Sequence, residues 1–293
     1  MWLYIRDMVN IKDIYIRDPF IYVEDDVAYL VGTTDESAWG GPAKSFLGYK
    51  TKDLINFEGP FVLFEANKDF WADENYWAPE LHKVDGKYLL VASFYKQGLT
   101  RRSQILISDS PMGRYIPVKT PFTPEEWMSL DATLWKEDGK LYTVFCHEWL
   151  QTIDGEMILG ELSEDYCSLK GEPIKLFNAS DAPWSRLHHD FASKGYITDG
   201  PFIYQMQNGN LAMLWSSFGA EGYACGVCYS SNGIKGPWRH QKEPIFKKDG
   251  GHAMIFSFKG KMYISLHCPN APHMMERPHF YEIMEKDDCL QIK

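Results

Sequence analysis

The sequence predicts an all-β fold and, within that class, a five-bladed β-propeller. Short runs rich in Val, Ile, Tyr, Phe and Leu dominate the chain, and strong helical periodicity is hard to find. Turns of the Asp-Gly, Asn-Gly and Lys-Gly types separate these runs, and each turn has a similar sequence around it. A repeated unit of this kind, with four strands per repeat, is typical of propeller blades.

Five hairpin turns mark five units along the chain. Each turn contains residues that tolerate a positive φ, as a tight β-turn requires. In chain order the turns are Asp25-Asp26, Asp85-Gly86, Asp138-Gly139, Asn208-Gly209 and Lys259-Gly260. The first is the most divergent, because it contains no glycine. Each turn is therefore expected to join two strands of one blade.

A second regularity precedes the turns. Counting back eight residues from four of them reaches Asp18, Ala78, Asp131 and His252. The fourth unit is slightly longer, and there Asp199-Gly200-Pro201-Phe202 parallels Asp18-Pro19-Phe20. We therefore place the starts of the units near residues 18, 78, 131, 199 and 252, and expect one domain over residues 1–293. The alternative is a β-sandwich without repeats, which the matched offsets disfavour.

The charge balance limits the classes of partner. The 30 basic and 40 acidic residues give a formal net charge of -10, which disfavours nucleic acid and anionic membranes and favours a neutral ligand such as a glycan. Aromatic residues make up 15% of the chain, which suits sugar binding, although large β proteins also use many aromatic residues. We expect an oligosaccharide partner and no organic cofactor.

Targeting signals and paired cysteines are hard to find in the sequence. Charges interrupt every apolar run well short of about 20 residues, and residues 1–18 lack the apolar stretch of a secretory signal. The six cysteines are scattered, and the Cys225-x-x-Cys228 pair has no second pair to complete a zinc site. These observations predict a cytoplasmic protein with free thiols.

Acidic residues begin three of the five units. The innermost strand of each propeller blade lines the central channel, so Asp18, Asp131, Asp199 and His252 are expected to meet in one pocket. Neighbouring carboxylates repel, so at least one keeps its proton to a higher pH, and glycosidic bond cleavage requires such a pair of one acid and one base. Alternatively, each Asp only caps an element. Asp7 has the same Tyr-Ile-Arg before it as Asp18 but lacks the Pro-Phe that follows.

These motifs resemble glycoside hydrolase family 43 over about residues 13–285. Arg17-Asp18-Pro19-Phe20 resembles the first-blade motif, in which the Asp is the catalytic base. Tyr76-Trp77-Ala78-Pro79-Glu80 resembles the second-blade motif that lines the sugar pocket. Asp131 in Ser129-Leu130-Asp131-Ala132 matches the third-blade Asp, which tunes the pKa of the acid and orients it.

The last two motifs of the resemblance concern the acid and an ion. Asp199-Gly200-Pro201 stands where the family usually has Glu-Gly-Pro, with the Glu as general acid. Asp is shorter than Glu by one methylene, so Glu148 and Glu221 remain alternative acids. Gly251-His252 resembles the fifth-blade His that binds a central calcium or sodium ion, directly or through water.

The resemblance implies an inverting mechanism with Asp18 as base, Asp199 as acid and Asp131 as the residue that holds the acid. Trp77, Phe20 and Glu148 are the expected substrate-binding residues. Three further tryptophans are weaker candidates for the pocket wall, since aromatic residues often pack blades together; they are Trp149, Trp184 and Trp215.

The resemblance also implies action on α-L-arabinofuranosyl or β-D-xylosyl linkages. The loops over residues 35–46 and 178–195 are long enough to close one side of a pocket, so we expect exo-action on short oligosaccharides. One alternative is a non-catalytic glycan-binding propeller, which the unusual Asp199 would suit. Another is a five-bladed hydrolase of β-galactan or of fructan. The fructan-cleaving group carries later Arg-Asp-Pro and Glu-Cys motifs, and neither is found in this sequence.

Overall fold

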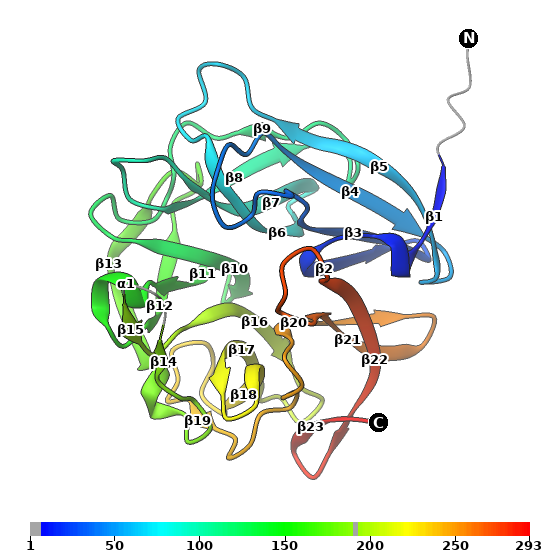
Figure 1. The fold of residues 1–293 in the computed structure, drawn as a ribbon. Helices are drawn as coiled ribbons and strands as arrows, with labels where there is room; N and C mark the ends of the chain where they lie inside the picture. The colour runs from blue at the N-terminus through cyan, green and yellow to red at the C-terminus, as the bar shows by residue number, and fades with distance from the viewer. Residues whose placement is uncertain (1–6, 190–192) are drawn as a thin grey trace.

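Five antiparallel sheets stand around a central axis in the computed structural model, which describes residues 7–189 and 193–293 (Figure 1). The structure is 57% strand and 4% helix, and the sheets form a five-bladed β-propeller. The predicted fold class is therefore confirmed.

The blades follow one another along the chain, and each begins with its innermost strand. Blade 1 has β2 (Arg17–Glu24), β3 (Val27–Thr33), β4 (Ser45–Thr51) and β5 (Asn56–Glu65), with β1 (Met8–Asn10) at its outer edge. Blade 2 has β6 (Glu74–Val84), β7 (Lys87–Tyr95), β8 (Arg102–Ser108) and β9 (Ile116–Pro117). Blade 3 has β10 (Ser129–Glu137), β11 (Lys140–His147), β12 (Glu156–Leu162) and β13 (Leu169–Asn178).

The C-terminal half repeats the same arrangement. Blade 4 has β16 (Asp199–Gln205), β17 (Leu211–Gly219), β18 (Gly222–Ser230) and β19 (Arg239–His240). Blade 5 has β20 (Gly251–Phe258), β21 (Lys261–Cys268), β22 (Arg277–Lys286) and β23 (Cys289–Ile292). Two short elements lie within blades: the 3-10 helix Ile11–Asp13 between β1 and β2, and helix α1 (Trp149–Thr152) between β11 and β12. Between blades 3 and 4 lie the 3-10 helix Ala179–Asp181 and the two-stranded sheet β14 (His188–His189) with β15 (Lys194–Gly195).

The first strand of every blade is interrupted at the same place. One residue there has a positive φ, and the pairing with the second strand shifts register directly after it, as in a β-bulge. These bulge residues are Asp18, Ala78, Asp131, Gly200 and His252. The expected unit starts agree at four of the five positions. In blade 4 the bulge residue is Gly200, so the start that the sequence predicted at Asp199 lies one position before the observed bulge.

Side-chain contacts join the first blade to the last. The described strands of blade 5 all come from the C-terminal part of the chain, and they do not pair with those of blade 1 (Figure 1). Instead, Arg17 Nη1 lies 2.6 Å from Glu276 Oε1, and both side chains are buried. The Ser265 hydroxyl donates to the Pro19 carbonyl at 2.8 Å. This closure lies directly beside Asp18.

Apolar side chains fill the spaces between blades. Trp184 and Trp215 pack together with their ring centroids 4.9 Å apart, in the cluster that joins blades 3 and 4. They are 4% and 0% exposed, so the suggestion that they line the pocket is wrong. Gly226 makes room for Trp184, because a Cβ at Gly226 would lie 2.1 Å from its ring.

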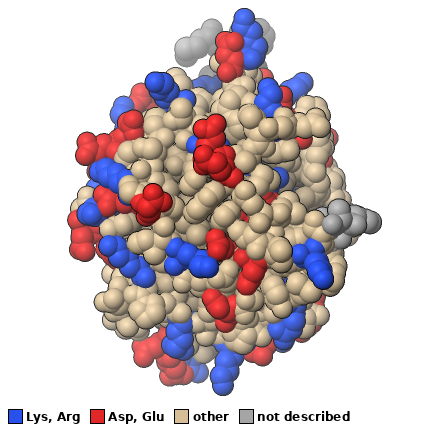
Figure 2. Space-filling model, turned by 90° about the vertical axis from the view of Figure 1, so that its left-hand side faces the viewer, with Lys and Arg blue, Asp and Glu red and all other residues tan. Residues whose placement is uncertain are grey.

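The outer surface carries both signs of charge. Figure 2 shows Lys and Arg side chains interspersed with Asp and Glu side chains over one side of the molecule.

All six cysteines are free thiols. In the described ranges, no helix has the length and apolar character needed to cross a membrane.

Candidate active site

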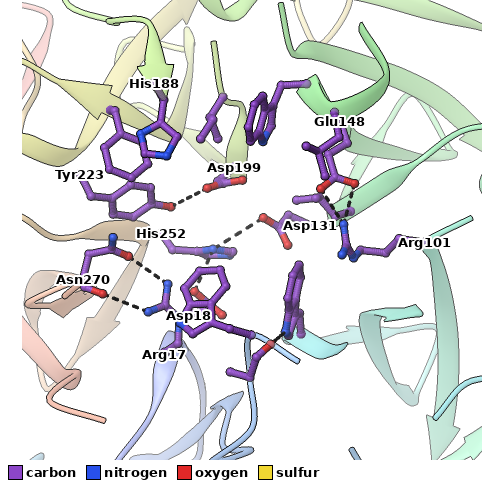
Figure 3. A pocket seen from close by; sticks show the side chains of 18 residues that line it. Arg17, Asp18, Arg101, Asp131, Glu148, His188, Asp199, Tyr223, His252 and Asn270 are labelled. Atoms are coloured by element: carbon purple, nitrogen blue, oxygen red, sulfur yellow. Dashed lines mark hydrogen bonds and ion pairs between the residues drawn. The ribbon is translucent and has the colours of Figure 1, made fainter. Parts of the chain in front are cut away.

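A cavity of about 350 Å³ opens on the axis, and every blade contributes to its wall (Figure 3). Asp18, Asp131, Asp199 and His252 all line it, as expected from their places at the starts of the inner strands. The bulge residue and the residue before it both reach the cavity in blades 1 and 3, and in blade 4 the residue before Gly200 does so. The bulges thus turn successive side chains of one strand toward the same space.

His252 lies among the three carboxyl groups. Its Nδ1 is 3.1 Å from Asp18 Oδ1 and 3.8 Å from Asp131 Oδ2 (Figure 3). Burial disfavours the charged imidazole, but Asp18, Asp131 and Asp199 outweigh it and raise the pKa of His252 to about 10. His252 is therefore a cation at neutral pH, and it separates charges that would otherwise repel.

Asp18 is held as an anion. Its Oδ2 accepts a hydrogen bond from the Thr33 hydroxyl at 2.7 Å. Burial opposes ionisation, yet the neighbouring His252 holds the pKa of Asp18 well below its usual range, with help from Arg17. Burial and Arg17 also lower the pKa of His267 to about 3, so its neutral Nδ1 accepts from the Asp18 backbone N–H at 3.2 Å and does not form an ion pair.

The pKa values of Asp131 and Asp199 are shifted in the opposite direction to that of Asp18. Burial is the largest cause in both, and it raises the pKa of Asp131 to about 8 and that of Asp199 to about 6. Asp131 Oδ2 accepts from the Gly200 backbone N–H at 3.2 Å, and Asp199 Oδ2 accepts from the Tyr223 hydroxyl at 3.1 Å. One cavity therefore contains an ionised carboxylate and two carboxyl groups that retain protons toward neutral pH.

Glu148 enters the cavity already paired. Both of its oxygens accept from Arg101 Nη1 at 2.6 Å, and both side chains are buried (Figure 3). The Arg101 guanidinium also lies over the Trp77 ring, 4.2 Å from its centroid. Glu221 lies elsewhere, because it is exposed, pairs with Lys247 at 3.5 Å and does not line the cavity. Of the alternative acids, only Glu148 is near the other carboxyls.

The tryptophan at the centre of the second-blade motif lies where the sequence placed it. Trp77 lines the cavity, and its indole N–H donates to the Ala38 carbonyl at 2.6 Å. Trp149 lines it as well. Trp39, which the sequence argument did not select, stands at the rim with its side chain 59% exposed.

Phe20 does not line this cavity, so its expected place in the pocket is wrong. It lies two residues beyond Asp18, which carries it about 6–7 Å along the channel, past the bulge. There it lines a second hollow at the other ends of the inner strands. Its ring packs against His82 and Phe202, with centroids 5.2 Å and 6.0 Å away.

Sequence reasoning also missed several polar residues of the wall. Arg17 lies against the loop of blade 5, where its Nη2 donates to Asn270 Oδ1 at 3.0 Å. Tyr223 lies near the start of β18 and Arg101 directly precedes β8, and no repeat marks their positions. Arg17 had a signal, because it directly precedes a bulge residue, as Trp77 and Asp199 do.

The donor set around His252 does not fit a directly ligated calcium or sodium ion. Calcium takes about six to eight oxygen ligands, and in the part of the chain that the structure describes no three His, Cys, Asp or Glu side chains are placed to share an ion. His252 Nδ1 lies 3.1 Å from Asp18 Oδ1 and is engaged with that carboxylate. An ion held through water stays a prediction.

Five blades around a cavity in which one carboxylate is held ionised and two carboxyl groups have raised pKa values define a carboxylate-dependent hydrolase of glycosidic bonds. The model of "Glycosyl hydrolases family 43" matches residues 11–286, so the chain belongs to this family and is an O-glycosidase. The family resemblance is thereby confirmed, and neither the non-catalytic propeller nor the fructan-cleaving group applies.

Individual relatives agree with this membership. The solved structure of an endo-arabinase from Bacteroides thetaiotaomicron is 38% identical, with a TM-score of 0.88 over 95% of this chain and 98% of that chain. A xylosidase/arabinosidase of Bacteroides ovatus is 27% identical in an alignment of 293 positions, which covers 86% of each protein. A probable arabinan endo-1,5-alpha-L-arabinosidase C of Aspergillus flavus is 26% identical over 214 residues, which are 71% of this chain and 61% of that protein.

Proposed function

We propose that this protein is an inverting glycosidase that removes terminal α-L-arabinofuranosyl residues from short oligosaccharides. The observation that carries the proposal is the division of charge in the cavity. Asp18 is ionised beside a cationic His252, while Asp199 keeps its proton to a higher pH. A base and an acid in one closed space are the two groups that hydrolysis of a glycosidic bond needs.

In the proposed reaction, Asp18 takes a proton from a water molecule, and the water oxygen bonds to the anomeric carbon. The bond from that carbon to the leaving oxygen breaks, and Asp199 gives its proton to this oxygen. Asp131 supports the acid by position, because its Oδ2 accepts from the N–H of Gly200, the residue next to Asp199, at 3.2 Å. Burial of Asp199 and the nearby charges of Asp18 and Glu148 favour the protonated form of the acid. The cation of His252 keeps Asp18 ionised between turnovers.

The sugar is inferred from the names of the relatives. Arabinose is the sugar common to the names of the endo-arabinase, the xylosidase/arabinosidase and the arabinan endo-1,5-alpha-L-arabinosidase. β-D-Xylosyl linkages are the second candidate, since the name of the Bacteroides ovatus protein includes xylosidase. We propose that Trp77 stacks on the sugar and that the Arg101–Glu148 pair bonds its hydroxyls.

Exo-action is supported by the shape of the wall. Trp39 from blade 1, His188 from the segment after blade 3 and Asn270 from blade 5 all line the cavity, so its wall includes loops from different blades. Its volume of about 350 Å³ is near the small end of ligand sites, which span roughly 300–1,000 Å³. Such a space suits the end of a chain better than its middle.

The test uses three measurements. A panel of nitrophenyl glycosides should show the highest kcat/KM for the α-L-arabinofuranoside, and linear arabinan oligosaccharides should release only arabinose. Proton NMR of the first product should show the inverted anomer. Early release of di- and trisaccharides would replace exo- by endo-action, a preference for the β-D-xyloside would change the sugar, and a retained anomer would contradict the roles of Asp18 and Asp199.

A further inference from the structure

Tyr223 of β18 makes a direct contact with the proposed acid. Its hydroxyl donates to Asp199 Oδ2 at 3.1 Å, and the ring lines the cavity (Figure 3). Burial holds the pKa of Tyr223 well above its usual range, so the hydroxyl is a neutral donor. Asp199 lies on β16 and Tyr223 on β18, so a different strand of the same blade holds the carboxyl of Asp199.

The ring of Tyr223 is itself fixed from several sides. It stacks on His267 with centroids 5.6 Å apart and planes 17° apart, and Phe218 meets it edge-on at 5.6 Å. A Cβ at Gly251 would lie 2.7 Å from the Tyr223 ring, so this glycine leaves the space that the ring occupies. A donor on so constrained a ring holds its acceptor in one place.

Asp199 needs such a constraint more than a longer side chain would. It is an aspartate where the sequence resembles a family motif with glutamate, so its carboxyl has one methylene less with which to reach the leaving oxygen. Charged and titratable groups also surround it from five other strands or loops; these are Asp18, Asp131, Glu148, Tyr223 and His252. A donor in a fixed position determines which carboxyl oxygen of Asp199 faces each of these neighbouring groups.

We propose that Tyr223 is the positioning residue of Asp199, and that its hydrogen bond to Oδ2 leaves Oδ1 to carry the proton to the leaving oxygen. The inference rests on the proposed function, in which Asp199 is the general acid. Because Tyr223 donates to the ionised form, it also favours that form, which agrees with the lower pKa of Asp199 than of Asp131.

The test is Tyr223→Phe, which keeps the ring and removes the donor. Two substrates with the same sugar are compared: a disaccharide, whose leaving oxygen needs a proton, and a dinitrophenyl glycoside, whose leaving group departs without one. We expect kcat on the disaccharide to fall about 10–100-fold, as for loss of a hydrogen bond to a charged group, while kcat on the dinitrophenyl glycoside changes little. The alkaline limb of kcat/KM on the disaccharide should move to higher pH.

Tyr229→Phe is the matched control. Tyr229 lies on the same strand and its hydroxyl is also hydrogen-bonded, to Gln241 Oε1 at 3.1 Å, but it does not line the cavity. The ratio of the two rates does not depend on how much of a variant is folded, so partial unfolding leaves the test valid. Equal losses on both substrates, or an unchanged ratio and pH profile, would overturn the inference.

Asp199→Asn separates this inference from the proposal beneath it. If Asp199→Asn keeps full activity on the disaccharide, Asp199 is not the acid, and the proposed function fails together with the role of Tyr223. If Asp199→Asn loses the disaccharide but retains the dinitrophenyl glycoside, the acid is assigned. An unchanged Tyr223→Phe would then refute the positioning role alone.

Discussion

Gly200 of blade 4 and the imidazole of His252 of blade 5 lie so close that a Cβ at Gly200 would be 2.7 Å from the ring carbons of His252. Gly200 is also the bulge residue of its blade, with φ 51, a conformation that side chains other than glycine adopt with strain. The other four bulge residues adopt a similar positive φ without being glycine. The glycine after the proposed acid is therefore needed chiefly for space, because it leaves room for the cation between the carboxyls.

Gly200→Ala should damage both stability and activity. The positive φ costs about 1–2 kcal/mol for alanine, and crowding of His252 should add about 1–3 kcal/mol. Gly209→Ala is the matched control, because Gly209 has φ 86 in the same blade and no atom within 4 Å of its Cβ position. Urea denaturation should show a smaller loss for Gly209→Ala and unchanged kcat. Equal losses in the free energy of unfolding for Gly200→Ala and Gly209→Ala would mean that His252 moves aside without an energetic cost.

Asp18→Asn should lower kcat about 10³-fold or more, since loss of a general base typically costs about 10²–10⁴-fold. The fold should persist, because Asn still accepts from the Thr33 hydroxyl. Thermal unfolding by circular dichroism would confirm this, with Asp109→Asn at an exposed site as control. Activity retained by a folded Asp18→Asn would remove the base assignment.

Glu276→Ala should test how the ring of blades is closed. Removing one partner of a buried ion pair leaves the other charge unpaired, which costs about 3–5 kcal/mol, and Arg17 Nη1 lies 2.6 Å from Glu276 Oε1. Asp109→Ala breaks an exposed pair with Lys87 and should leave the free energy of unfolding unchanged. Denaturant titration measures both. A loss for Glu276→Ala as small as that of the control would show that closure depends on apolar packing instead.

Stability should fall as pH rises from 5 to 8. Burial raises the pKa of Asp131 to about 8 in the folded protein, against about 3.9 in an unfolded chain. The folded state then holds a proton that the unfolded state releases, so this stabilisation is complete below about pH 4 and disappears by about pH 8. Asp131→Asn cannot titrate, so its Tm should fall less between pH 5 and pH 8. An equal fall in both proteins would contradict the raised pKa.

Much of the site could be predicted from periodicity, because the inner strands repeat. The count from each hairpin turn placed Asp18, Asp131 and His252 on bulges that the structure shows at those residues. In blade 4 the start was placed at Asp199 by the parallel with Asp18-Pro19-Phe20 and not by the count, and it was one residue off, because the bulge residue is Gly200. The prediction that Phe20 lines the cavity was wrong for a related reason, since the residues beyond the bulge face the other end of the channel.

The sequence did not predict the cavity residues that lie outside the repeated motif. Tyr223, Arg101, Asn270 and Trp39 stand on second and third strands or on loops whose lengths differ between blades, so no offset connects them to the bulge residues. The ion pair of Arg17 with Glu276 joins the two ends of the chain, and only closure of the ring brings them together.

By itself, the sequence determined the number of blades and the residues offered at the head of three inner strands, because alternation along a strand and glycine-bearing turns are local properties of the chain. Only the tertiary structure decided the state of those residues. Whether a carboxyl holds its proton depends on burial and on charges that arrive from other blades, as His252 arrives beside Asp18. That neighbourhood is made by the closure of the propeller, and no single segment contains it.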